Sequence, residues 1–161
     1  MSLIYLKFGD KIKGEVTSEG HKDWIEMTSC QFGTGRALGS PTGTAASRET
    51  GSVHVSEIVC TKINDVASEP LFRESLDGKA QLATIHFTKS NDSGGFETYL
   101  ELKLTECLIS GYSMSSGGDK PTESLSLNFT KIEYKYIPYD SAHKPESPLT
   151  GGFDLKATKA F

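Results

Sequence analysis

The stretch from residue 122 to residue 139 constrains the fold more than any other part of the chain. Its first half alternates apolar and polar residues with a period of two, the pattern of a β-strand with one buried face. The apolar positions then change parity, and they are Leu125, Leu127 and Phe129 before the change and Ile132, Tyr134 and Tyr136 after it. A flat strand cannot bury both sets against one core. We therefore expect a long, bent strand, in which a bulge re-aims the side chains or the chain passes from one packed layer to another.

A second stretch, from residue 96 to residue 110, changes parity in the same way. Leu100, Leu102 and Leu104 are in register, after which Cys107 and Ile109 take over the apolar positions. A strand of this length is too long to stay flat in a small domain. Together with shorter alternating runs and many turn residues, the pattern predicts an all-β fold. We expect two packed antiparallel sheets that form a sandwich or a β-barrel-like unit.

One short α-helix is predicted near residues 68–77. Ser68 is a suitable cap, Glu69 and Pro70 suit the first turn, and Gly78 suits the end. Four residues have the spacing of one helix face, and we expect them to cover one side or opening of the β structure. They are Leu71, Phe72, Ser75 and Leu76.

Length and composition predict a single domain over residues 1–161. The 16 glycines and 6 prolines indicate many turns, and the net charge of −4 comes with no long block of like charge, which argues against a nucleic-acid partner. No apolar run approaches the roughly 18 residues of a membrane span, so no membrane insertion is expected. The N-terminal residues lack the features of a signal peptide, so we expect a cytoplasmic protein whose export would bypass that route.

The sequence contains no recognisable catalytic, cofactor or metal site, and we expect no enzyme. His54 and His86 fall at polar positions of strands without metal-ligand spacing to a Cys, carboxylate or second His. Glu101 and Glu133 alternate with lysines, which is typical of a solvated or interface face rather than of an acid–base pair. The three cysteines lack C-x-x-C spacing and lie in strand-like segments, so buried, reduced thiols are expected. They are Cys30, Cys60 and Cys107.

Residues 33–51 form the one long irregular stretch, rich in glycine and poor in apolar residues. Such a loop within a compact domain is usually functional or disordered. We interpret it as an extended Gly-rich loop that reaches a partner, with simple flexibility as the alternative. The strand before it, residues 24–32, has two mixed faces, which is expected where both faces contact something other than bulk solvent.

Five segments, in this order and spacing, resemble the haemolysin-coregulated proteins, which build the inner tube of bacterial type VI secretion systems. The segments are residues 10–15 (DKIKGE), 20–26 (GHKDWIE), 56–62 (SEIVCTK), 121–134 (PTESLSLNFTKIEY) and 151–156 (GGFDLK). The stretch at 121–134 is the most specific, and the resemblance covers nearly the whole chain. Cys30 and Phe32 depart from many relatives, in which tryptophans are common.

The resemblance implies a β-barrel-like protomer in a homo-hexamer whose stacked rings form a tube driven by a contracting sheath. The implied partners are the sheath and spike proteins and small secreted effectors carried in the lumen. The protein would assemble in the cytoplasm and then be secreted to the extracellular space or a target cell. No cofactor is implied.

Two sets of contact residues are expected. Ser29 and Gln31 are the candidates for the lumen, because Cys30 and Phe32 of the same strand are better core residues. The Gly-rich loop resembles the family's extended loop, which reaches the neighbouring subunit or the next ring. Its candidates for ring or stacking contacts are Arg36, Leu38, Ser40, Thr42, Arg48 and Glu49.

A different class of function stays open beside this one. A monomeric β-barrel could bind a small apolar ligand, but it would need an inward cavity. The leucines and phenylalanine of the two long stretches are sufficient to fill the interior. An enzyme is the third alternative, with His54 or His86 as the residues to test.

Overall fold

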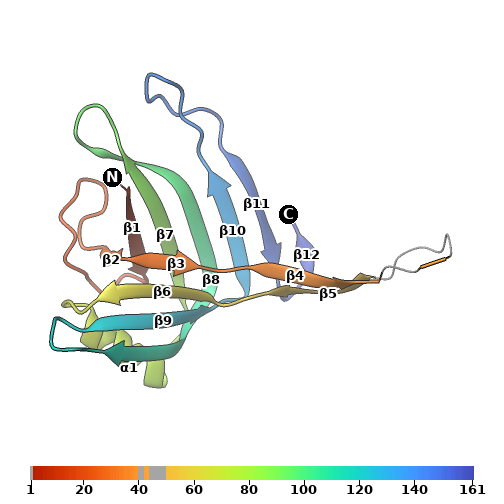
Figure 1. Ribbon diagram of the computed structural model, residues 1–161, viewed down its shortest axis with the longest axis horizontal. Helices are drawn as coiled ribbons and strands as arrows, with labels where there is room; N and C mark the ends of the chain where they lie inside the picture. The colour runs from red at the N-terminus through yellow and green to blue at the C-terminus, as the bar shows by residue number, and fades with distance from the viewer. Residues whose placement is uncertain (1, 40–41, 44–49) are drawn as a thin grey trace.

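The computed structural model of the chain describes residues 2–39, 42–43 and 50–161, and in them antiparallel strands predominate (Figure 1). Within those residues one α-helix, α1 (Ser68–Asp77), accompanies the strands. The strands are β1 (Ser2–Phe8), β2 (Ile25–Met27), β3 (Ser29–Gln31), β4 (Thr34–Leu38), β5 (Thr50–Val55), β6 (Ile58–Ile63), β7 (Gln81–Ser90), β8 (Phe96–Ser115), β9 (Thr122–Asn128), β10 (Lys131–Tyr136), β11 (Leu149–Asp154) and β12 (Lys159–Ala160).

The strands form two sheets that share β8. The larger one, sheet A, has the order β12-β11-β10-β8-β7-β1-β2, and the smaller one, sheet B, has the order β3-β6-β9-β8. Sheet B crosses one end of sheet A, so that the two enclose the interior like an incompletely closed barrel (Figure 1). β4 and β5 pair only with each other and make an arm that projects away from both sheets. The mainly β, two-sheet, barrel-like fold that the sequence predicts is therefore confirmed.

Each change of parity in the sequence marks a place where the chain passes between the sheets. β8 pairs with β7 and β10 up to Cys107 and with β9 from Leu108 onward. At the corner Glu106 has a φ of 51°, in the left-handed region that suits a local bulge. β9 in sheet B leads to β10 in sheet A, and at that corner the Thr130 N–H donates to the Thr105 carbonyl at 3.1 Å. The two corners therefore lie side by side.

A third corner explains the mixed faces of residues 24–32. The expected single strand is divided at Thr28 into β2, which belongs to sheet A, and β3, which belongs to sheet B. Ile25 and Met27 are buried before the corner, and Cys30 packs against the core after it. Phe32, expected in the core, is instead 37% exposed, because it follows β3 at the base of the arm.

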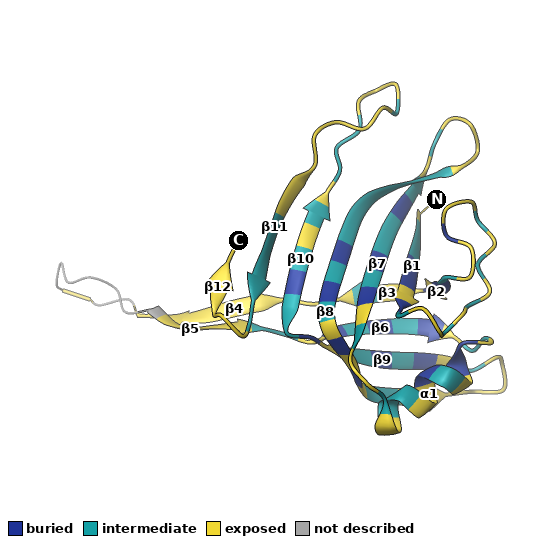
Figure 2. Ribbon diagram, turned by 180° about the vertical axis from the view of Figure 1, so that it is seen from behind, coloured by how far each residue is buried: buried dark blue, intermediate teal, exposed yellow. Residues whose placement is uncertain are grey.

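The core lies where the sheets overlap (Figure 2). Leu125 and Leu127 of β9 are fully buried, as are Leu102 and Leu104 of β8. Ile58 and Cys60 of β6 complete the contact from sheet B, and Leu71 of α1 closes it from the side. Burying a large aliphatic side chain contributes about 1.5–3 kcal/mol. The interior of this unit is thus filled by side chains.

The helix begins at Ser68, but Ser68 is not the N-cap residue that the sequence suggested. Ala67 is the cap residue, and Ser68 is the first helical residue, with its hydroxyl buried beside Lys62. The predicted apolar face is also only partly used, because Leu71 is buried whereas Leu76 is 69% exposed. Phe72 packs beside Tyr112 of β8, with ring centroids 5.6 Å apart. No helix in the described part of the chain is long and apolar enough to cross a membrane.

Candidate functional site

The two candidate lumen residues lie on β3, on the face of sheet B that points away from the core. Ser29 and Gln31 are both exposed, whereas Cys30 between them packs inward. The Ser29 hydroxyl contacts the Thr61 hydroxyl at 2.5 Å, and Thr61 contacts the Thr28 hydroxyl at 2.7 Å. This surface is therefore lined by short hydroxyl side chains, which solvate well and offer no large apolar contact. What the surface faces in an assembly stays a prediction.

The ends of the expected Gly-rich loop are strands. β4 and β5 pair from Thr34↔Val55 to Leu38↔Thr50, with a register shift between Arg36 and Leu38. Arg36, Leu38 and Thr42 are exposed, so three of the candidate contact residues are available on the arm. Ser40, Arg48 and Glu49 lie outside the described residues. Val53 opposite Arg36 is also exposed, at 39%.

An exposed apolar surface lies on sheet A, beyond its overlap with sheet B. One row crosses four strands through the pairs Phe87↔Leu100, Leu100↔Tyr136 and Tyr136↔Leu149. Phe87 and Leu100 are partly buried, whereas Tyr136 is 41% and Leu149 67% exposed. We call this row, with the neighbouring Tyr134, the open face of sheet A. The sequence pattern placed Tyr134 and Tyr136 on the same face as Ile132. It did not indicate that sheet B covers this face only as far as Ile132.

A buried ion pair joins sheet B to the helix. The Lys62 ammonium is fully buried and donates to Glu123 Oε1 at 3.0 Å, to Ser68 Oγ at 2.9 Å and to the Ile63 carbonyl at 3.0 Å. Asp65 Oδ1 lies 2.9 Å from the same nitrogen. Burial raises the pKa of Glu123, but hydrogen bonds from Ser68, Lys62 and Asn64 and the Lys62 charge outweigh it, so that its pKa is lowered. The carboxylate is thus held ionised.

The sequence contained a signal for this pair. Lys62 is at the parity of Ile58 and Cys60, and Glu123 is at the parity of Leu125 and Leu127, so both charges point inward. In the structure the two residues are register partners. Opposite charges at core parity, one near the end of β6 and the other near the start of β9, would have predicted the Lys62–Glu123 contact.

A histidine cluster lies on sheet A, where His86 of β7 is the register partner of Tyr5 on β1 and of Glu101 on β8. His21 Nε2 and His86 Nδ1 lie 2.9 Å apart, and His86 Nε2 lies 3.1 Å from Glu101 Oε2. The Trp24 ring stacks near His86, with centroids 4.6 Å apart, and the Tyr5 ring lies 4.7 Å from that of His21. The side chains in contact are thus aromatic rings and one carboxylate, and a structural network fits them better than a nucleophile–base pair.

Burial governs the protonation of both rings. It lowers the pKa of His21, and the neighbouring His86 lowers it further against a backbone hydrogen bond at Glu19. Burial also lowers the pKa of His86, with Glu101 opposing and Lys135 reinforcing the shift. The sequence pattern placed Glu101 on a solvated or interface face, and spacing alone could not bring it together with the two histidines.

The other histidines are distributed over the surface. His54 is exposed on the arm, and His143 Nδ1 lies 2.8 Å from Glu97 Oε1. Its pKa is raised, mainly by that hydrogen bond. Across residues 2–39, 42–43 and 50–161, no three His, Cys, Asp or Glu side chains come together as metal ligands.

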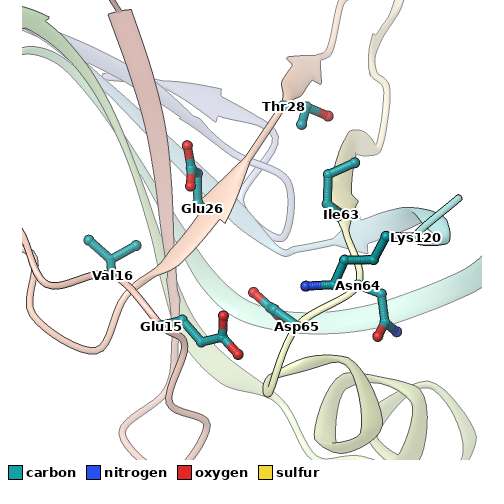
Figure 3. Close-up of a pocket in the computed structure, with 8 residues that line it drawn as sticks. All are labelled: Glu15, Val16, Glu26, Thr28, Ile63, Asn64, Asp65 and Lys120. Atoms are coloured by element: carbon teal, nitrogen blue, oxygen red, sulfur yellow. The ribbon is translucent and has the colours of Figure 1, made fainter.

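A polar cleft of about 350 Å³ lies between the segment before β2, β2 itself and the turn after β6 (Figure 3). Its lining includes three carboxylates and one ammonium, of Glu15, Glu26, Asp65 and Lys120. Glu15 accepts a hydrogen bond from the Val66 N–H at 3.1 Å, which ties the segment before β2 to the start of α1. The remaining lining residues are Val16, Thr28, Ile63 and Asn64. This lining does not suit a small apolar ligand.

The comparisons with known proteins agree with the arrangement of sheets and arm. A family model described as "Type VI secretion system effector, Hcp" matches residues 5–136. The chain belongs to the Hcp family. The predicted resemblance to the haemolysin-coregulated proteins is thereby confirmed, and this Hcp is a secreted tube protein of the type VI secretion system. The Hcp family is a family of structural, secreted tube proteins.

Similar proteins cover nearly the whole length of this Hcp. Protein hcp1 of Pseudomonas aeruginosa is 27% identical over 157 residues, 95% of this chain and 94% of that protein. A solved structure of a type six secretion system protein is 26% identical, with a TM-score of 0.89 and 100% of both chains covered. The crystal structure of Hcp1 from Salmonella typhimurium has the same fold, with a TM-score of 0.77, 24% identity and 99% of both chains covered.

Proposed function

We propose that this Hcp chain forms hexameric rings that stack into the inner tube of a type VI secretion system and carry small effectors in the lumen. Residues 1–161 act as one domain with no catalytic role. The sheath and spike proteins are its structural partners. The rings assemble in the cytoplasm, and the subunits leave the cell without a signal peptide. Family membership supports the tube role, and the ring and its cargo are inferences from the surfaces described above.

The open face of sheet A carries the proposal. Its row begins against the core at partly buried Phe87 and Leu100 and ends at exposed Tyr136 and Leu149, so an apolar surface extends beyond the part of the protomer that is covered. Surface of this kind is usually covered by a partner, and a closed ring of identical subunits covers it on every copy. Tyrosine is also enriched at protein interfaces. We therefore assign this face to the contact between neighbouring subunits of one ring.

The other two surfaces fit the remaining parts of the tube. Ser29 and Gln31 give β3 a small, polar outward face, suited to a wet lumen from which cargo must be released. The arm presents Arg36, Leu38 and Thr42 away from its own sheets, where they can reach the adjacent subunit or the next ring. Arms that exchange between subunits add contact area without altering the protomer core.

A matched pair of substitutions tests the ring contact. Leu149 on the open face and Leu76 on α1 are 67% and 69% exposed, so Leu149→Glu and Leu76→Glu introduce the same charge at equal exposure. Native mass spectrometry of the wild type should give a six-subunit species, and electron micrographs should show rings. Leu149→Glu should yield folded monomers, whereas Leu76→Glu should keep the hexamer.

Three outcomes contradict the proposal. A wild-type protein that stays monomeric at high protein concentration would show that no ring forms. Hexamers that survive Leu149→Glu show that the open face is not the contact. An oligomer of another size contradicts the assignment to a six-subunit tube.

A further inference from the structure

Two cysteines oppose each other across sheet B. Cys30 of β3 and Cys60 of β6 are register partners in an antiparallel pair, so their side chains leave the sheet on the same face. Both contact the core, and each thiol shifts the pKa of the other. Directly opposed residues have Cα atoms about 4.5–5.5 Å apart, within the roughly 4.4–6.8 Å that a disulfide spans. The backbone therefore already has the spacing that a Cys30–Cys60 bond needs.

The two thiols differ in access and acidity. Cys30 is partly exposed, whereas Cys60 is fully buried. The hydrogen bond from Cys60 lowers the pKa of Cys30, and the same hydrogen bond, together with burial, raises that of Cys60. Burial alone raises the pKa of Cys107 to about 12. The accessible thiol is thus also the better nucleophile, and Cys107 is the inert one.

We propose that Cys30 and Cys60 are an oxidation site, which closes to an intramolecular disulfide when the chain meets a low-molecular-weight disulfide such as glutathione disulfide. The Cys30 thiolate attacks one sulfur of the reagent, forms a mixed disulfide and releases one thiolate, which takes up a proton. The Cys60 sulfur, as its proton leaves, attacks the Cys30 sulfur and expels the second thiolate. Two protein thiols are oxidised and one disulfide is reduced to two thiols.

The bond would close a loop that contains the arm. β3 has three residues, and its ladder with β6 is correspondingly short, from Ser29↔Thr61 to Gln31↔Val59. β4 and β5 both lie between Cys30 and Cys60 in sequence, so the bond anchors the base of the arm covalently. Chains that leave a reducing compartment meet conditions in which such a bond persists. The inference does not depend on the ring proposed above.

Alkylation of the denatured protein after oxidation tests the site. The folded full chain is incubated with excess glutathione disulfide, quenched in acid, denatured and alkylated, and its mass and non-reduced peptides are determined. The reduced protein has three free thiols, and oxidation should leave only Cys107 reactive, with residues Cys30 and Cys60 in one linked peptide pair. The variant Cys107→Ala should also lose two reactive thiols on oxidation. Thermal unfolding should shift upward by roughly 5–10 °C, because the unfolded chain is constrained.

Cys30→Ser supplies the contrast, because Cys30 is partly exposed and its replacement leaves the buried cysteines in place. This variant should keep both remaining thiols reactive after the same treatment and show no upward shift. The site is excluded if all three wild-type thiols stay reactive, or if a glutathione adduct on Cys30 accumulates without the internal bond. It is equally excluded if the bond joins two chains, or if Cys30→Ser still loses two thiols, which would identify Cys60 and Cys107 as the pair.

Discussion

The half of sheet A that faces sheet B and the half that extends beyond it have the same alternating strands but bury very different amounts of surface. On β8, Leu104 and Leu102 are fully buried, and Leu100 of the same face is only partly so. On β10, Ile132 is 6% exposed, and Tyr134, two residues further along the same face, is 44% exposed. Alternation therefore determines which residues share a face. Whether that face is covered depends on where the opposing layer ends.

Buried and exposed regions also differ in how their polar side chains are used. Lys62 and Glu123 are buried where sheet B meets the helix, with every Lys62 donor engaged, and they behave as part of the core. The arm and the open face bear exposed side chains that the protomer itself does not use. Stability is thus concentrated in the overlap, and assembly is expected to depend on the remainder.

Lys62→Met should give the largest loss of stability. It leaves the Glu123 carboxylate buried without its cation, and breaking one partner of a buried ion pair costs about 3–5 kcal/mol. Equilibrium unfolding in urea measures the change. The double variant Lys62→Met/Glu123→Leu should recover most of the loss, because neither charge is then left alone. Lys7→Met, which removes an exposed ion pair with Asp10, should leave the midpoint nearly unchanged.

Leu127→Ala and Leu149→Ala compare the two regions directly. Leu127 is fully buried, so its truncation should cost about 2–5 kcal/mol of unfolding free energy. Leu149 is 67% exposed, and its truncation should change the protomer by less than about 0.5 kcal/mol. The measurement requires protein dilute enough to be monomeric, because assembly adds to apparent stability. Equal costs in the monomer would mean that the open face is part of the core.

Shortening the arm should affect contacts between rings and leave folding intact. Removal of residues 39–47 should keep the circular dichroism spectrum, the unfolding midpoint and the hexamer, and should weaken stacking into tubes. Electron microscopy counts rings and tubes at matched concentrations. A variant in which the same residues are replaced by an equally long Gly–Ser segment separates the effect of length from that of sequence. Tubes formed as readily as in the wild type would exclude a stacking role.

The sequence predicted the bends of the fold because a strand's parity reports directly on which layer it packs in. The changes after Phe129 and around Glu106 both mark crossings between sheets. The crossing at Thr28 was missed, because β2 and β3 are too short to establish a period before it changes.

Contacts between strands were less accessible from the sequence. The Cys30↔Cys60 pairing requires the register of β3 on β6, which no local pattern specifies. Phe32 and Leu76 looked like core residues from their chemistry, but they are exposed because nothing in the protomer lies over them. The histidine cluster joins a loop residue, His21, to His86 on a strand 65 residues later, and its existence depends on the tertiary fold.

The smallest expected effect concerns this histidine cluster. The folded pKa of His86 lies below its unfolded value near 6.5, so the unfolded state binds more protons in that range. The stability contributed by the neutral ring is therefore complete above about pH 6.5 and decreases as the pH falls toward the folded pKa. Urea midpoints measured from about pH 7.5 to about pH 5 should show this slope. The variant His86→Gln should flatten this slope. The control variant His54→Gln, on the exposed arm, should keep it. Equal slopes in the wild type and His86→Gln would mean that His86 contributes nothing to the pH dependence.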